Sequence, residues 1–376
     1  MKLTPIKLRG RGRKKSWAPP NPKRFKRAAR EDEEGQDSAI QRDGDGQQRQ
    51  RKRIKAKKPG PRIEQLPAEI LERIFIASEN LNFPRSSLRI GFMLSARSLL
   101  SELLVAAFTP TWDLWFGCPK QLVHSYAGWE QDAARFGGNP NFQSAVLACS
   151  WANLSLLLDA QQVWYRRHGA GRYYQHIPDS SRIVQSLRRE HLRRSINEER
   201  QFHAREGGFD HGKDVKNCFN EDWEEFKMIH QLTRYDFRFF VKHIQCNSSF
   251  LEIHPLTRIP NLLLTGPFDW EKAKWLYWLI RAGARLSHEQ TWELTIRGYE
   301  SFMKLDDPAL ALHLLPMFFR LGVFGLHWPE QLIEEKLDEA LHQTSDGSML
   351  ADSARVWTTA ENMIVFSIRS RDRSRG

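Results

Sequence analysis

The distribution of charge constrains the fold of this sequence more than any other feature. Residues 1–60 carry 20 Lys and Arg against 7 Asp and Glu, a net charge of +13, whereas the remaining 316 of the 376 residues carry a net charge of −1. A folded domain that binds nucleic acid normally has a basic patch on its own surface. The sequence therefore predicts a nearly neutral folded part that follows a strongly basic segment.

The basic segment, residues 1–60, is predicted to be disordered. It has few large aliphatic side chains and many Gly, Pro, Gln and Arg residues, so it buries too little apolar surface to offset the entropy lost on ordering. Its run Arg51–Lys58 predicts a nuclear import signal that an import receptor would bind. The basic residues of this signal are Arg51, Lys52, Arg53, Lys55, Lys57 and Lys58. The alternative is a solvated charge run with no partner; the expected location is nuclear, with a cytoplasmic pool also compatible.

Several classes of protein are disfavoured by what the sequence lacks. No run approaches the ~18 consecutive apolar residues of a membrane span, so no membrane partner is expected. The four cysteines are widely spaced, which indicates reduced thiols in an intracellular protein. There is no GxSxG, HExxH, GxxxxGK[ST] or CxxC pattern, and we expect no cofactor, no metal and no catalytic activity.

Residues 63–108 have the pattern of three short helices. The first opens at Pro67, which suits a helix start because it has no N–H to leave unbonded. A second is predicted from Ser86 or Ser87 to Leu94, and a third over 98–108.

The apolar residues of the first helix form two adjacent stripes, 66/70/74 and 71/75, which is wider than one buried face requires. A unit of about 45 residues is near the lower limit for independent folding. We therefore expect it to share one stripe with a partner or with the rest of the chain. The alternative is that these are simply the first helices of a larger helical domain.

The same residues resemble the F-box, in the variant abundant in filamentous fungi. The resemblance rests on the motif Leu66-Pro67-x-Glu69-Ile70-Leu71-x-x-Ile74-Phe75, followed by LNFPRSS at 81–87, LSAR at 94–97 and ELLVAAF at 102–108. The Asp-Leu and Val-Cys-x-x-Trp elements of the general F-box pattern are absent. F-box proteins are substrate receptors of SCF (Skp–cullin–F-box) ubiquitin ligases.

This resemblance implies partners and roles for particular residues. Leu66 and Pro67 would start the contact with the Skp adaptor, and four further residues, Ile70, Leu71, Ile74 and Phe75, would divide between that contact and the F-box core. The implied partners are the adaptor, through it a cullin, and an unknown protein substrate. The protein itself would catalyse no bond chemistry.

The body of the chain, residues 111–366, is predicted to be mostly helical and to bind the substrate. Residues 141–164 have a helical period. Residues 270–283 and 309–322 align at an offset of 39, and each ends in Arg-x-Gly, a suitable helix stop. The offset fits ankyrin-like helix pairs stacked as repeats; two ordinary core helices with glycine stops fit equally well.

The sequence thus predicts an all-α protein in four parts: a disordered basic tail (1–60), an F-box (61–110), a helical body (111–366) and a second disordered basic tail (367–376). The expected function is that of an F-box substrate receptor. One alternative is a nuclear chromatin- or RNA-associated protein that uses its N-terminal tail on phosphates. The other is an enzyme with a novel site, recognisable by a deep pocket lined with titratable groups.

Overall fold

The described part of the chain is mostly helical. A computed structural model describes residues 62–117, 134–176, 209–210, 214–229, 250–345 and 350–375. Two short strands, β1 (Tyr174–Gln175) and β2 (Phe209–Asp210), pair antiparallel with Tyr174 opposite Asp210. The all-α prediction is therefore confirmed. None of the described helices combines the length and apolar character needed to cross a bilayer.

The predicted basic tail and its import signal, Arg51–Lys58, lie outside the described residues. The same holds for Cys118 and Cys246.

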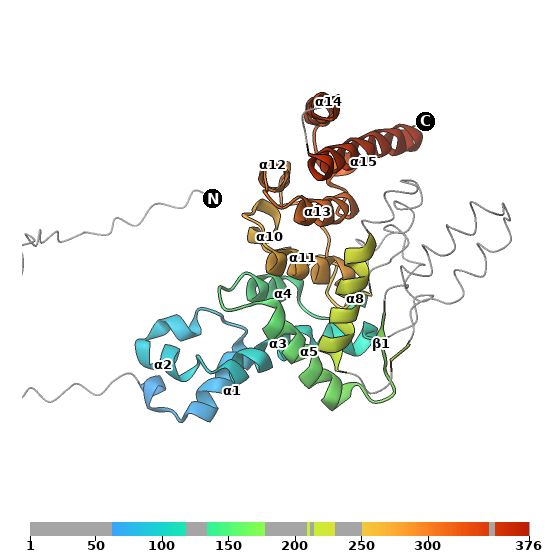
Figure 1. Cartoon of the computed structure of the whole chain (residues 1–376). Helices are drawn as coiled ribbons and strands as arrows, with labels where there is room; N and C mark the ends of the chain where they lie inside the picture. Colours follow the sequence, from blue (N-terminus) through green and yellow to red (C-terminus); the bar gives the residue numbers. More distant parts are fainter. Residues whose placement is uncertain are drawn as a thin grey trace, which may run out of the picture. The chain divides into compact units, whose positions relative to one another are not determined.

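The first helices follow the predicted pattern closely (Figure 1). They comprise the 3₁₀ turn η2 (Arg62–Gln65), α1 (Ala68–Ser78), the 3₁₀ turn η3 (Phe83–Ser86), α2 (Leu88–Met93) and α3 (Arg97–Trp115). Pro67 occupies the position just before the first helical residue of α1. The Ser87 hydroxyl accepts a hydrogen bond from the backbone N–H of Ile90 and so caps α2, as serine commonly does.

α3 connects these helices to the body of the protein. It continues through Pro110 to Trp115, and so extends across the boundary predicted at residue 110. Trp112 is completely buried, its ring lies 5.4 Å from that of Phe108, and its indole N–H donates to the carbonyl of Glu252 at 2.8 Å. One hydrophobic core runs from the first helices to the C-terminal ones, so the first three helices are not packed independently.

The described part of the body contains ten further helical elements. They are α4 (Pro140–Leu147), α5 (Leu154–His168), α8 (Val215–Ile229), α10 (Leu262–Thr265), α11 (Trp270–Ala282), α12 (Trp292–Met303), α13 (Pro308–Arg320), the π-helical turn η8 (Val323–His327), α14 (Glu330–Ser345) and α15 (Ala351–Arg375). The stretch predicted over 141–164 is two helices rather than one. Its break lies before Asn153, whose side chain accepts from the Leu156 N–H and starts α5.

The C-terminal helices stack in successive layers, with α11 against α13, α13 against α15 and α15 against α14 (Figure 1). Both predicted glycine stops are present: Gly283 (φ 105°) follows α11, and Gly322 (φ 75°) follows the last turn of α13. These left-handed conformations are readily available to glycine and strained for other residues. The ankyrin-like repeat stays a prediction.

The disordered tail predicted at 367–376 is corrected by the structure, since α15 continues to Arg375. Its inner face explains why: Ser367 is buried, Ile368 packs against the core, and the Arg371 guanidinium donates to Glu330 at 2.9 Å. The arginine-rich composition favours a tail, but Ser367, Ile368 and Arg371 recur at helical spacing on the side that faces α14 or the core.

Removal of residues 367–376 should therefore destabilise the protein. The deletion removes the buried Ser367, the packed Ile368 and the Arg371–Glu330 pair. We expect the thermal midpoint to fall by roughly 2–6 °C, the size of change that ~1–2 kcal/mol produces in a domain of this kind. Removal of 374–376 alone is the control and should change little. An unchanged midpoint after the longer deletion would contradict the packed end of α15.

Candidate functional site

The most exposed apolar side chains of the first helices are on α2. Leu88 is 96% exposed and Phe92 is 83% exposed, the two highest values among the large apolar residues that the structure describes as exposed. They are four residues apart on one helix, so they lie on the same side of it. We refer to Leu88 and Phe92 as the outer face of α2.

The opposite side of α2 is part of the core. Ile90 and Leu94 are each 1% exposed. Gly91 sets a close approach to the preceding turn, because a Cβ there would come within 2.8 Å of the Pro84 carbonyl oxygen. The helix is therefore fixed by its inner side, and the outer face of α2 points to solvent without a role in that packing.

α1 divides its two apolar stripes in a similar way. Leu71 and Phe75 are fully buried, and the Phe75 ring lies 6.4 Å from that of Phe83. Ile70 is 40% exposed, and Pro67 is exposed as well.

The structure therefore sorts the six residues expected at an adaptor contact. Leu71 and Phe75 serve the core and are inaccessible to a partner. The other four, Leu66, Pro67, Ile70 and Ile74, are exposed or half-buried. Leu66 also packs in part against the core.

Sequence reasoning missed the outer face of α2. The signal was available as two apolar residues at positions i and i+4 of a short helix, but the same spacing describes Ile90 and Leu94. Only the packing shows which pair is buried. Ile63, just before α1, adds another exposed apolar side chain in this part of the chain.

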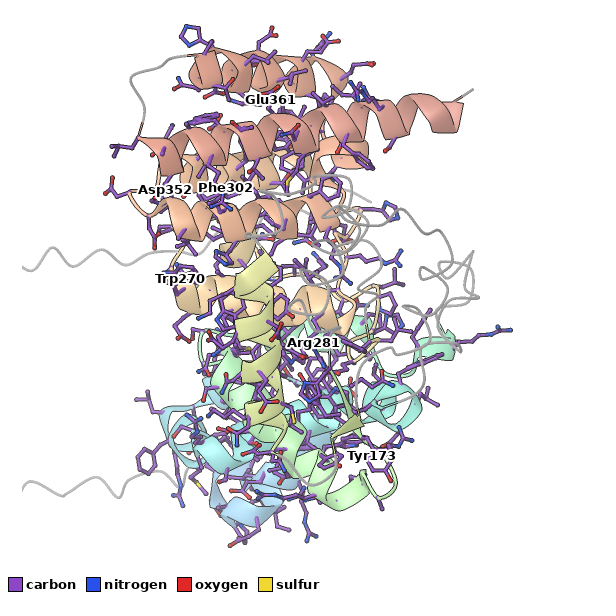
Figure 2. All side chains as sticks on the ribbon, turned by 45° about the vertical axis from the view of Figure 1, so that its right-hand side comes forward. Tyr173, Trp270, Arg281, Phe302, Asp352 and Glu361 are labelled. Carbon is purple, nitrogen blue, oxygen red and sulfur yellow. The ribbon has the colours of Figure 1, made fainter. Side chains whose placement is uncertain are left out.

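A second candidate site is a cluster of buried charges around Arg281 (Figure 2). The Arg281 guanidinium donates to the Asp222 carboxylate at 2.8 Å, to the Glu252 carboxylate at 2.9 Å and to the Gln175 carbonyl at 2.6 Å. Arg281, Asp222 and Glu252 each have a side chain that is at most 2% exposed. Burial alone would lower the pKa of Arg281, but Glu252 and Asp222 raise it, so the guanidinium stays charged.

Each carboxylate of this cluster has further donors. Asp222 also accepts from the Tyr174 hydroxyl at 3.1 Å, and its other oxygen lies 3.1 Å from the Nδ1 atom of His176. Glu252 accepts from the Gln161 amide at 2.7 Å. Two carboxylates thus face Arg281 and His176, and the close contact with Asp222 favours the protonated form of His176.

His176 is suited to that charge. Burial is the largest single influence and disfavours the imidazolium, but the interactions with Asp222 and Cys218 together outweigh it and raise the pKa of His176 from 6.5 to about 10. The neighbouring Cys218 thiol is completely buried and acts in the same direction on this pKa.

Chemically, the cluster acts as an internal cross-link. It connects α8, α11, β1 and the segment around Glu252, with its hydrogen-bonding groups directed at one another. Within the described ranges, no group of three or more His, Cys, Asp or Glu side chains is arranged to hold a metal ion.

Comparison of the chain with protein-family models, with curated proteins and with solved structures finds no match to any of them.

Substitution Arg281→Met should strongly destabilise the fold. It would leave Asp222 and Glu252 buried without their shared counter-charge, and loss of one partner of a buried ion pair typically costs about 3–5 kcal/mol. Chemical denaturation measures the effect. The control is Arg97→Met, which removes the exposed pair with Asp159 and should cost at most ~1 kcal/mol. Equal effects for the two variants would contradict the structural role of the cluster.

The stability that His176 contributes should depend on pH. Its folded pKa of about 10 lies above the ordinary value of 6.5. The contribution is therefore fully present below about pH 6.5 and is lost as the pH rises toward 10. We expect the difference in thermal midpoint between the native chain and His176→Gln to be largest near pH 6 and to shrink steadily up to pH 10. A difference that does not change with pH would rule out a charged His176.

Proposed function

We propose that this protein is an F-box substrate receptor, which uses its first helices to bind a Skp adaptor and its helical body to hold a target protein. The single observation that carries the proposal is the outer face of α2, where Leu88 and Phe92 stand almost fully in solvent. This feature supports a protein partner because contiguous exposed apolar surface is disfavoured in a chain that works alone.

The arrangement of α1 and α2 gives the partner a preformed surface. Both helices are anchored from their inner sides by Leu71, Phe75 and Ile90, so the outward residues need little reordering on binding. Binding to side chains that are already ordered loses less conformational entropy than binding that must first order them. Residues of the F-box motif that remain accessible, such as Pro67 and Ile70, would extend the same contact.

In this function the protein contributes proximity rather than chemistry. A receptor that holds both the adaptor and the target raises the effective concentration of a target lysine near the charged conjugating enzyme. Proximity of this kind can supply a large part of the rate increase of a bimolecular transfer. The target would be bound by the body, and the adaptor by α1 and α2.

The double substitution Leu88→Ala/Phe92→Ala should separate partner binding from folding. Burial of one such side chain is worth roughly 1.5–3 kcal/mol, so loss of two should weaken adaptor binding more than tenfold. Stability should change by less than ~0.5 kcal/mol, because neither side chain packs in the core. Binding to a purified Skp–cullin complex by calorimetry and the thermal midpoint are the two measurements.

The matched control is Leu341→Ala/Leu350→Ala, which removes two exposed leucines from the C-terminal part of the chain. It should leave adaptor binding unchanged. A separate Pro67→Ala/Ile70→Ala variant tests α1 in the same assay. If the native chain binds the adaptor with the same affinity as both double variants, neither α1 nor α2 carries the contact. If the native chain does not bind at all, the F-box function is excluded.

The basic segment 1–60 supports a second candidate function, binding to chromatin or RNA. Its net charge of +13 favours phosphate contacts. We propose instead that Arg51–Lys58 is a nuclear import signal. Two measurements distinguish these functions. The affinity for nucleic acid should fall steeply between 50 and 200 mM salt. Nuclear import in cells should instead be lost when the basic residues of Arg51–Lys58 are replaced. A fluorescent fusion that stays nuclear after Ala replacement of the basic residues of this run would exclude it as the signal.

A further inference from the structure

A cleft of about 510 Å³ lies where the end of α5 meets the start of α8. Its volume is within the range of small-ligand pockets. Figure 2 labels one of its residues, Tyr173, on the segment that leads into β1. The cleft is lined by Gln162, Tyr165, Arg166, Gly169, Ala170, Gly171, Arg172, Tyr173 and Asp214.

The loop that forms one wall of this cleft is held rigidly. The Arg172 backbone N–H donates to the Gly169 carbonyl, and the Tyr165 hydroxyl donates to the Arg172 carbonyl, both at 2.9 Å. Only glycine fits at 169, because a Cβ there would come within 2.4 Å of the Tyr165 ring. The conformation of the 169–172 loop is therefore fixed by contacts within the chain.

Arg172 fixes this loop to α3. Its guanidinium donates to the carbonyls of Trp112 and Phe116 at 3.0 Å each and also to that of Asp113. The Nη1 and Nη2 atoms of Arg172 are thus bonded to carbonyls at the end of α3, and its positive charge lies at the edge of the cleft.

Arg166 differs from Arg172 in its hydrogen bonding. It is exposed and lines the cleft, and the structure gives it no carboxylate partner among the described residues. Its neighbour Arg167 points to another side and forms a two-pronged pair with Glu102 at 2.6 and 2.7 Å. Arg166 is therefore the uncommitted cation of this cleft.

Further hydrogen-bond donors line the same cleft. The Gln162 side chain uses its oxygen to accept from the Val215 N–H at 2.6 Å, which leaves its NH₂ group as a donor. Among the described residues, no acceptor is bonded to the backbone N–H of Ala170 or Gly171. Asp214 is the one carboxylate of the lining, and its Oδ1 atom already accepts from the Lys216 N–H at 3.0 Å. Donors and positive charge thus outweigh acceptors.

We infer that this cleft binds an anionic group of a peptide, either a phosphate or a carboxylate. Arg166 would supply the main charge contact, and Gln162 and the 170–171 backbone would supply neutral hydrogen bonds. The inference rests on the proposed function, because a substrate receptor needs a site for its target outside α1 and α2. The rings of Tyr165 and Tyr173 would flank the peptide segment next to the anion.

Peptide pools of random sequence around a fixed central residue can test this inference. The central residue would be phosphoserine, glutamate or serine, and binding to the full chain would be followed by fluorescence anisotropy at 150 mM salt. We expect the phosphoserine pool, the glutamate pool or both to bind and the serine pool to bind at least tenfold more weakly. Whether one pool or both bind identifies the source of the anion.

Two variants locate the binding. Arg166→Gln should weaken binding of the anionic pools at least fivefold, and Arg167→Gln, the adjacent arginine that pairs with Glu102, should not. Residues 1–60 are identical in both variants, so a difference in binding between Arg166→Gln and Arg167→Gln reports the cleft and not the basic segment. Equal losses in both variants, or equal binding of the serine pool, would overturn the inference. Adaptor binding measured on Arg166→Gln should be unchanged, so failure of the cleft and failure of the receptor function give different results.

Discussion

The structure depends on the paired charges around Arg281. This side chain belongs to α11, but its partners come from α8, from the segment after residue 250 and from β1. The guanidinium also lies 4.5 Å from the Tyr174 ring and 4.3 Å from the Phe250 ring, so aromatic faces enclose the charges. Burial of ions is tolerated only when each is paired and hydrogen-bonded, and here the cluster satisfies that condition. The helices cannot slide past one another without breaking several of these bonds together.

A neutral polar network continues from this cluster toward α3 and α4. The Gln143 amide donates to the Ala107 carbonyl and to the Thr111 hydroxyl, and its oxygen accepts from the His254 N–H and the Thr257 hydroxyl. Glu252 lies between the two sets, since its carbonyl accepts from Trp112 and its carboxylate from Arg281. Polar bonds of this kind select one arrangement of the helices, where apolar packing alone would tolerate several.

Much of the local structure could be predicted from the sequence. Helical period, Pro67, the serine cap of α2 and the two glycine stops are short-range signals, and the structure bears out the helices that they indicated. The break between α4 and α5 was missed because the residues before Asn153 continue an apolar pattern, while the cap is a single polar side chain. The end of α15 was missed because its many Arg and Ser residues favour a disordered tail, although its apolar residues keep a helical spacing.

The candidate sites were harder to predict, for reasons of sequence distance. Arg281 has the appearance of an ordinary basic residue in the last turn of a helix, but its carboxylate partners are 29 and 59 residues away along the chain. The outer face of α2 was hidden for the opposite reason, since an apolar residue is expected to be buried unless the packing shows otherwise. The cleft beside α5 could not be predicted because its lining residues are far apart in the sequence. Tyr173 and Asp214, for example, are separated by a long segment.

The continuity of α3 has a consequence for how a bound target would be presented. The helix begins at Arg97, with three residues between it and the end of α2, and ends at Trp115, where Arg172 donates to the carbonyls of Trp112 and Phe116. Its 19 residues span about 28 Å at 1.5 Å per residue. An adaptor on α2 and a peptide in the cleft would thus be bound near the two ends of one continuous helix, α3. The distance between the adaptor and the bound peptide would then be constant. Target lysines would be selected by their distance along the target from the bound segment, as well as by the sequence of that segment.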